Sequence, residues 1–542
     1  MSVGSPAHDL LRRPRGERAG RATGVIEPAT AALVGLTAIG AALRFYRIAH
    51  QGFWFDEANT AMLVHLSPGK MLGLLPQSES TPPLYYCVAW VWARVFGFGE
   101  GGLRSLSAVA GTLTVPVAYG IAVKLLSRRA AVIAAALTAC SPLLIWYSQE
   151  ARSYSLLVLL AGLSLLAFAH ARAAPTPRTL TLWALASALA LATHYYAVLA
   201  VVPEALWLLI EHRHRGAVRA AFVFVALCGL ALIPLAISQN GTGNDSWIAA
   251  APLAQRLRQI LPQFLIGTNA PDRMLLKYVS FALALAALAL LALPSPPRRP
   301  FQRAHGSERG GALAAGALAV GGFALCLILL AAGFDDLITR NIIVLWLPCA
   351  VLVAGGLAVG RARALGPAIA VALCAIGVIA TVGIATERSM QRPDWRYVAR
   401  ALESPPTPPG SGPVPAAAAG SARGDGRAIL VQHYAYLLPL SLYLHGLRTM
   451  RHAERISEID VISMVSPQQP LCWWGAACNL IPSQMQRRYA IPGFHAVSRR
   501  HVLQFTILRL VSDRPRTVSR ADVSAALRTT RLHHDELIYQ PG

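Results

Sequence analysis

The sequence predicts an α-helical polytopic membrane protein with a small C-terminal α/β domain outside the membrane. Of its 542 residues, 55% are hydrophobic and only 14% are charged, and the mean hydropathy is +0.47. A soluble protein of average composition carries about 25% charged residues. Apolar runs of roughly 16–23 residues, long enough to cross a bilayer as helices, recur between residues 30 and 386. They predict about eleven transmembrane helices.

The net charge of +23 lies in short basic clusters between the apolar runs. This pattern is typical of cytoplasmic loops under the positive-inside rule, so it indicates membrane topology and argues against nucleic-acid binding. Six of the eight cysteines lie in apolar stretches, and no pair has zinc-ligand spacing alongside histidine. Cys472 and Cys478 bracket a polar Trp-Trp-Gly segment, where an oxidising compartment favours a local disulfide over free thiols.

The first apolar run, Thr30 to Ile48, follows a polar, Arg-rich segment at residues 1–28. Such an arrangement occurs in cleaved signal peptides and in signal anchors. No small-residue cleavage site is visible after the run, which indicates a signal anchor with a cytoplasmic N-terminus. The chain then emerges on the outer face at the segment Gly-Phe-Trp-Phe-Asp-Glu-Ala of residues 52–58.

The next apolar run, Pro82 to Phe98, admits two interpretations. As a second span it would put the basic loops at 211–215 and 297–309 on the outer face, against the positive-inside rule. As a helix on the outer membrane surface it leaves those loops in the cytoplasm. Its Pro-Pro start, aromatic residues and Arg94 suit an interfacial helix. We therefore expect the outer loop 49–103 to contain a surface helix at 82–98.

The remaining apolar runs are expected to cross the membrane in alternating directions. Under this order the Arg-rich loops face the cytoplasm, and the loop 239–277, with a surface helix at Pro252–Ile266, lies outside. These predicted spans are 104–126, 130–147, 154–171, 179–194, 196–211, 218–238, 278–294, 312–332, 341–360 and 364–386.

Four regions follow from this organisation. They are a basic cytoplasmic tail (1–28), a transmembrane domain (29–386), a linker (387–426) and an outer α/β domain (427–542). In the outer domain, the composition predicts strands at Ala428–Gln432 and Val502–Leu510 and a helix at Tyr434–Leu444. No internal repeat is visible in the sequence, which argues against an inverted-repeat transporter.

Asp56 and Glu57 are the first candidates for chemistry. Adjacent acids in a loop are usually solvated, but these two stand beside Trp54 and Phe55, directly after a span. A carboxylate in half-apolar surroundings holds a proton more readily and can serve as a general base. The residues alone leave both interpretations open.

A second polar cluster is the turn at 147–154, which carries Glu150 and Arg152 on the same predicted outer face. Charge between spans is costly unless it is paired or used. The two residues are therefore either one structural ion pair or contacts for a substrate.

Two further clusters lie at the outer ends of spans. His194 and Tyr195 interrupt two apolar runs, either as structural residues or as substrate contacts. Arg340 follows Asp335 and Asp336 and begins an inward span. Its guanidinium is suited either to anchoring the helix at the interface or to binding a phosphate.

Four motifs together resemble the integral membrane GT-C glycosyltransferases: the Asp-Glu pair, Pro-Pro-Leu-Tyr-Tyr at 82–86, Arg104-x-x-Ser107-Ala108, and Tyr-Ser-Gln-Glu-Ala-Arg-Ser-Tyr at 147–154. This superfamily includes the protein O-mannosyltransferases and the lipid A aminoarabinose transferase, and the chain is most similar to its bacterial family 39-like members. The resemblance covers about residues 30–385, and the segment 392–396 is similar to the start of their outer domain. The family often has His-Pro-Pro where this chain has Thr-Pro-Pro at 81–83, so no role of that histidine carries over.

The resemblance implies a GT-C fold with an outward-facing active site. It also implies transfer of a mannose- or arabinose-type sugar from a polyprenyl-phosphate donor to an acceptor, with inversion at the anomeric carbon. Carried over residue by residue, Asp56 is the catalytic base, Glu57 supports it, and Arg340 contacts the phosphate. The candidate substrate contacts are Glu150, Arg152, His194, Tyr195 and Arg340.

The expected partners are membrane lipid, the lipid-linked donor and a lipid, glycan or protein acceptor, with no nucleic acid. The expected location is the plasma (inner) membrane. No cofactor is expected to be obligatory, although an Asp-Glu pair can hold a divalent metal. The alternatives are a lipid-linked sugar flippase or transporter, which should show repeats and broken helices near the midplane, a glycan polymerase or ligase, and a structural membrane protein.

Overall fold

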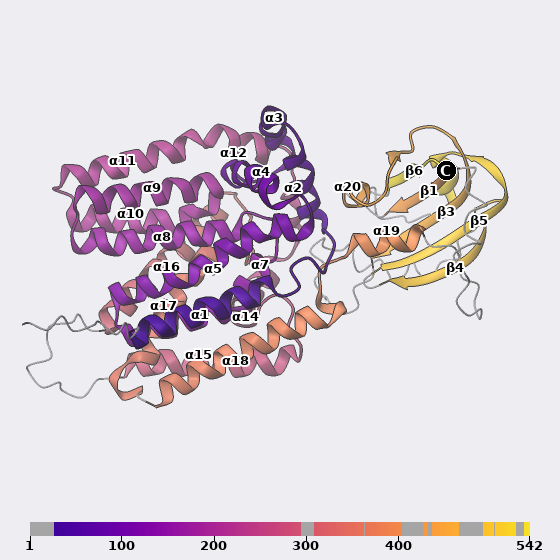
Figure 1. Cartoon of the computed structure of the whole chain (residues 1–542). Helices are drawn as coiled ribbons and strands as arrows, with labels where there is room; N and C mark the ends of the chain where they lie inside the picture. The colour runs from indigo at the N-terminus through magenta and orange to yellow at the C-terminus, as the bar shows by residue number, and fades with distance from the viewer. Residues whose placement is uncertain are drawn as a thin grey trace, which may run out of the picture.

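The computed structural model describes residues 27–293, 308–362, 364–403, 426–431, 436–464, 491–502, 505–526 and 536–542. These residues form a bundle of long helices with a small β-sheet at one end (Figure 1), which confirms the predicted fold class. Two short helices, α19 (Trp395–Glu403) and α20 (Leu437–Ser441), lie between the bundle and the sheet. The predicted disulfide Cys472–Cys478 lies outside the described residues.

The bundle is built from helices that match the predicted spans. Among the described residues, eight helices are long and apolar enough to cross a membrane, or nine if one bent pair counts as a span. The eight are α1 (Pro28–Phe45), α5 (Glu100–Leu125), α8 (Tyr154–Ala173), η1–α10 (Tyr195–His212), α11–α12 (Gly216–Asn240), α15 (Arg273–Ala292), α16 (Glu308–Ala331) and α18 (Leu365–Thr386). The predicted spans 179–194 and 341–360 correspond to the shorter helices α9 (Pro177–Thr193) and α17 (Trp346–Ala358). The chain is therefore a multi-pass membrane protein.

The bent pair occupies the predicted span 130–147. There, α6 (Arg128–Cys140) and α7 (Pro142–Ser148) meet at 53°. Pro142 has no N–H to continue the ladder, so carbonyls at the end of α6 lose their helical donors. Arg44 of α1 replaces them, donating to the carbonyls of Thr138 and Ala139, both at 3.0 Å. The predicted span 130–147 therefore corresponds to two helices that meet at a bend.

The outer loop 49–103 is more helical than predicted. It holds α2 (Phe55–His65), α3 (Pro68–Ser78) and α4 (Leu84–Phe96), of which only α4 was expected. With 13 residues, α4 is too short to cross a bilayer. On the later outer loop, α13 (Ser246–Ala250) precedes α14 (Leu253–Ile266), which matches the predicted helix there. Helices α2, α3, α4 and α12 (Ile233–Asn240) all lie at the end of the bundle that faces the sheet (Figure 1).

The C-terminal region forms a six-stranded sheet within the described residues, in the order β2-β6-β1-β3-β5-β4. Only β1 and β3 pair in parallel. The hydrophobic face is closed by α19, whose Trp395 is 1% exposed and packs on Phe505. The elements of this region are β1 (Gly426–Val431), β2 (Arg448–Thr449), β3 (Glu454–Met464), β4 (His495–Val502), β5 (Phe505–Val518), α22 (Arg520–Ala526) and β6 (Glu536–Gln540).

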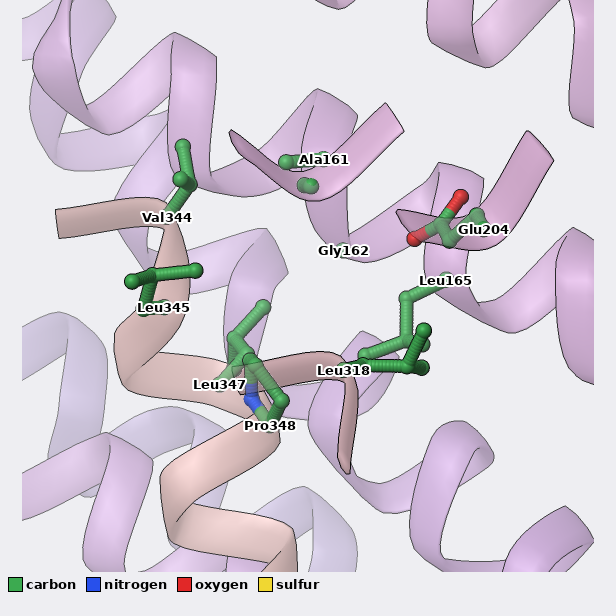
Figure 2. Close-up of a pocket in the computed structure, with 10 residues that line it drawn as sticks. Ala161, Gly162, Leu165, Glu204, Leu318, Val344, Leu345, Leu347 and Pro348 are labelled. Atoms are coloured by element: carbon green, nitrogen blue, oxygen red, sulfur yellow. The ribbon is translucent and has the colours of Figure 1, made fainter. Parts of the chain in front are cut away.

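One acid lies deep inside the bundle. Glu204 of α10 is 2% exposed, and its Oε2 accepts hydrogen bonds from Ser164 Oγ of α8 at 2.5 Å and Trp183 Nε1 of α9 at 2.9 Å. Figure 2 shows its carboxylate at the edge of a small cavity lined by apolar side chains, among them Leu165 and Leu318. The acid therefore joins three helices at a depth where polar groups need partners.

We predict that Glu204→Ala destabilises the bundle by about 1–3 kcal/mol, because it leaves the Ser164 and Trp183 donors buried without an acceptor. Glu204→Gln keeps an acceptor oxygen and should cost less. Thermal unfolding in detergent measures both. The matched control is Glu211→Ala on the same helix. It removes an ion pair to Arg172 in which both side chains are more than 30% exposed, so it should lower the stability by less than about 1 kcal/mol. Equal midpoints for Glu204→Ala and wild type would contradict this role.

Candidate functional site

The candidate site begins at the first turn of α2. Glu57 is fully buried and pairs with Arg104 of α5 through two bonds, Nε to Oε1 at 2.7 Å and Nη2 to Oε2 at 2.5 Å. Its Oε1 also accepts from the Ala151 N–H at 2.8 Å. Burial acts to raise the pKa of Glu57, but the charge and hydrogen bonds of Arg104 outweigh it, and the pKa is lowered. Glu57 is therefore an ionised anchor that joins α2, α5 and the 149–153 turn.

Asp56, the neighbour of Glu57, faces a different partner. Its Oδ2 accepts a hydrogen bond from Arg340 Nη1 at 3.0 Å, although the two residues are 284 positions apart in the sequence. The side chains are 15% and 14% exposed, respectively. Arg340 also lies near the rings of Tyr154 and Trp247, with its Cζ 5.7 and 5.2 Å from their centroids. The predicted base and the predicted phosphate ligand are thus in direct contact.

Arg340 retains donor capacity beyond the Asp56 bond. Its Nε is buried and has no hydrogen-bond partner among the described residues. A guanidinium carries five N–H donors in a planar fork and suits an anion with several oxygens. The arrangement leaves Arg340 able to take a second anionic group.

Glu150 is buried next to the Asp56–Arg340 pair. It is 1% exposed, and its Oε2 accepts from Arg392 Nη2 at 3.2 Å, while its Oε1 has no partner among the described residues. Burial raises the pKa of Glu150 to about 7, against the lowering effect of Arg392, and the negative charge of Asp56 adds to the rise. This carboxyl therefore changes charge near neutral pH.

Arg152 does not pair with Glu150, so the proposed structural ion pair within the turn is absent. Its Nη1 instead bonds Glu79 Oε1 at 2.8 Å and reaches the Asp56 carbonyl at 3.3 Å. Glu79 also accepts from Asn59 Nδ2 at 2.7 Å. Arg152 thus ties the 149–153 turn to both ends of the α2–α3 segment.

His194 and Tyr195 lie at the break between α9 and α10. His194 is 3% exposed, and its Nδ1 accepts from the Tyr196 N–H at 3.2 Å, which caps the turn. The Tyr195 hydroxyl donates to Gln239 Oε1 at 2.7 Å. Gln239 in turn donates to the carbonyls of Leu75 and Thr81. In this structure His194 therefore stabilises the turn between α9 and α10, and Tyr195 is connected through Gln239 to the segment 75–81.

The two acids before Arg340 have separate surroundings. Asp335 forms a bidentate pair with Arg256 at 2.6 and 2.8 Å. Burial and the negative charge of Asp245 raise the pKa of Asp336 to about 6, and a hydrogen bond from Tyr196 lowers it in part. Among the described residues, no group of three or more His, Cys, Asp or Glu is arranged to hold a metal ion.

The structure thus brings Asp56, Arg340, Glu150 and Arg152 together at the end of the bundle where α2 lies. Two small cavities among the described residues lie elsewhere: one borders Glu204, and the other is lined by Tyr147 and by residues of α5 and α8. Neither is lined by Asp56.

Sequence reasoning gave no role to three site residues. Arg104 and Arg392 were present only inside motifs that carried the family resemblance, without a partner. Glu79 lies inside a polar Gln-Ser-Glu-Ser stretch, which is typical of an ordinary loop. The two arginines could have been recognised as members of ion pairs, because a charged side chain buried near a membrane needs a counter-ion.

We predict a pH-dependent stability effect at Glu150. Its folded-state pKa of about 7 lies above the unfolded value of about 4.3, so this group favours folding at low pH and loses that contribution as the pH rises through 7. Glu150→Gln does not titrate. The unfolding midpoint of the variant, relative to wild type, should therefore rise between pH 5 and pH 8. A difference that stays constant over this range would count against the raised pKa.

Comparison with known proteins gives a family model that matches part of the chain and solved structures with a similar fold. Residues 80–238 match the family model described as dolichyl-phosphate-mannose-protein mannosyltransferase. This match is less than half of the chain and contains Glu150, Arg152, His194 and Tyr195. No curated protein matches the chain in sequence.

Among solved structures, the apo form of ArnT from Cupriavidus metallidurans is similar at a TM-score of 0.50 and 14% identity, covering 89% of this chain and 98% of that one. The form of ArnT bound to undecaprenyl phosphate has a TM-score of 0.48 at 13% identity, with the same coverage. The Pmt1–Pmt2 complex of S. cerevisiae, bound to the sugar donor, has a TM-score of 0.28 at 15% identity and covers 40% of this chain and 33% of that one.

At an identity this low, the likeness to apo ArnT, at a TM-score of 0.50, bears on the fold alone. Together with the family match, it confirms the resemblance that the sequence motifs indicated. The chain has the GT-C fold and resembles the integral membrane glycosyltransferases of that superfamily.

Proposed function

We propose that this protein transfers a sugar from a polyprenyl-phosphate carrier to a hydroxyl acceptor on the outer face of the membrane. The observation that carries the proposal is the contact between Asp56 and Arg340 at 3.0 Å. It places an acid able to take a proton beside a cation able to hold a phosphate, at one end of a membrane bundle.

The reaction needs a base on one side of the anomeric carbon and charge stabilisation on the other. The acceptor oxygen attacks the anomeric carbon, the bond from that carbon to the phosphate oxygen breaks, and the acceptor proton passes to the Asp56 carboxylate. The electron pair of the broken bond leaves on the phosphate, where the Arg340 guanidinium stabilises it. Direct displacement inverts the anomeric configuration.

The neighbouring residues then have supporting roles. Glu57 has its carboxylate fully engaged by Arg104 and Ala151, so we assign it to positioning the first turn of α2. Glu150 has one unpartnered oxygen and is the better candidate for a substrate contact. Arg152, bonded to Glu79, holds the loop that carries Asp56.

The Asp56–Arg340 pair has to open during the reaction. While Oδ2 of Asp56 accepts from Arg340, one carboxylate oxygen and one N–H of the guanidinium are occupied by each other. A donor phosphate competes with Asp56 for Arg340, and its arrival frees the carboxylate for the acceptor proton. Base activation is thus linked to donor binding.

A mannose- or arabinose-type sugar on the carrier is the narrower proposal. It is supported by the family description, which names dolichyl-phosphate mannose, a polyprenyl-phosphate sugar. A glycan polymerase or ligase would instead require a pyrophosphate-linked donor, and a flippase would move the carrier without transferring the sugar.

We predict that Asp56→Ala and Asp56→Asn lower kcat by about 10²-fold or more, since general-base catalysis contributes about 10²–10⁴-fold. The purified full-length protein in lipid nanodiscs would receive polyprenyl-phosphate mannose or arabinose with lipid, oligosaccharide and peptide acceptors. Release of free polyprenyl phosphate reports turnover with any of these acceptors.

The matched control is Asp272→Asn, an exposed acid before α15 in another outer loop, which should keep wild-type turnover. Retained activity in both Asp56 variants would sink the base assignment. Carrier movement across the bilayer with no sugar release in the wild type would favour the flippase.

We also predict that Asp56→Asn binds polyprenyl phosphate more tightly than wild type, by about 5-fold if the lost competition is worth about 1 kcal/mol. The reason is that the variant no longer competes for Arg340 or repels the phosphate. Titration of the carrier phosphate into nanodiscs measures the affinity.

Arg340→Gln should bind the carrier phosphate more weakly than wild type. In that background, adding Asp56→Asn should give a smaller gain, because part of the effect runs through Arg340. If the single variant Asp56→Asn bound polyprenyl phosphate more weakly than the wild type, Asp56 would not compete with the phosphate for Arg340.

A further inference from the structure

The segment that delivers Asp56 to the site is held from two sides. From the membrane side, Arg104 donates to the carbonyls of Ile48, Gln51 and Gly52 at 2.8–2.9 Å. From the other side, residues after the last span make a second set of contacts. The loop 48–54 therefore lies between the helical bundle and the C-terminal region.

Tyr443, which follows α20, is the central contact on that second side. Its hydroxyl accepts a hydrogen bond from the Phe53 N–H at 2.7 Å and donates to Glu100 Oε1 at 2.9 Å. Glu100 is the first residue of α5, the helix that also carries Arg104. One phenol thus links the C-terminal region, the loop and the bundle.

Arg396 of α19 supports the same arrangement. Its Nη1 lies 3.3 Å from Glu100 Oε1, and its Nη2 donates to the His50 carbonyl at 2.5 Å. Gly52 lies so close to the start of α19 that a Cβ on it would be 2.4 Å from Oδ1 of Asp394, directly before the helix, and 2.8 Å from Cβ of Arg396. The absence of a side chain at Gly52 is therefore what allows α19 to pack on the loop.

The packing around the loop is apolar and tight. Phe53 is 5% exposed, and Leu442 and Tyr443 pack against the cluster that contains it. Asp56 follows three residues after Phe53, in the first turn of α2. Any shift of the Phe53 backbone therefore moves the start of α2 and the carboxylate that it carries.

We propose that Tyr443 is a positioning residue for Asp56. The C-terminal region then contributes to the site by holding the backbone that carries the base. Arg340 reaches the site from a different loop, before η3 (Ile343–Leu345), and does not depend on Tyr443. The C-terminal region thus controls the placement of the base, while the Arg340 guanidinium stays available to the phosphate. This inference rests on the proposed function.

The test is Tyr443→Phe, which removes the hydroxyl and keeps the ring in its apolar contacts. In full-length protein in nanodiscs we expect kcat to fall about 10-fold or more, since a displaced catalytic group costs rate, with no loss of affinity for polyprenyl phosphate. Hydrogen exchange should become faster at the Phe53 amide, which loses its acceptor. The matched control is Tyr539→Phe in β6, which should change neither kcat nor exchange at Phe53.

The outcomes separate this inference from the proposed function. If Asp56→Asn is inactive while Tyr443→Phe has wild-type kcat and protected Phe53, the positioning role is wrong and the proposed function stands. If Asp56→Asn is fully active, the proposed function itself fails. A loss of carrier-phosphate affinity equal to the loss of kcat in Tyr443→Phe would indicate general disruption and would also overturn the positioning role.

Discussion

The buried ion pair between Glu57 and Arg104 is the constraint on which this end of the bundle depends. Removing one partner of a buried pair typically costs about 3–5 kcal/mol, because the other charge stays buried alone. Here the pair does more than satisfy two charges. Arg104 also binds the loop carbonyls before α2, and Glu57 also binds the turn after α7. These bonds fix the backbone on both sides of Asp56, because Asp56 lies directly before Glu57 in the chain.

Asp56 and Arg340 form a different kind of pair. Both side chains are partly exposed, and neither is locked by as many bonds as Glu57 and Arg104. Such a pair holds its two side chains in place, and in the proposed reaction a substrate with its own negative charge replaces one of them. The two adjacent acids therefore have different roles in the proposed reaction. Glu57 is fixed by its buried ion pair, and Asp56 can exchange its partner.

The sequence was sufficient to predict the long helices of the bundle and most of their boundaries, because apolar runs between basic loops reflect the thickness and topology of the bilayer. The bend after Cys140 was hidden inside one apolar run, although Pro142 was visible. Pairings within the site were not predictable. Arg392 and Glu150 lie 242 positions apart, and nothing local to either residue identifies the other. Glu57 was expected to assist Asp56, and only its bonds to Arg104 showed how it is held.

The most direct measurement is an experimental structure of the full-length protein in lipid nanodiscs with polyprenyl phosphate bound. The account predicts that the phosphate oxygens lie within hydrogen-bond distance of the Arg340 guanidinium, that Asp56 has separated from Arg340, and that the Glu57–Arg104 pair is unchanged. A carrier phosphate bound elsewhere, with the 3.0 Å contact between Asp56 and Arg340 intact, would contradict it.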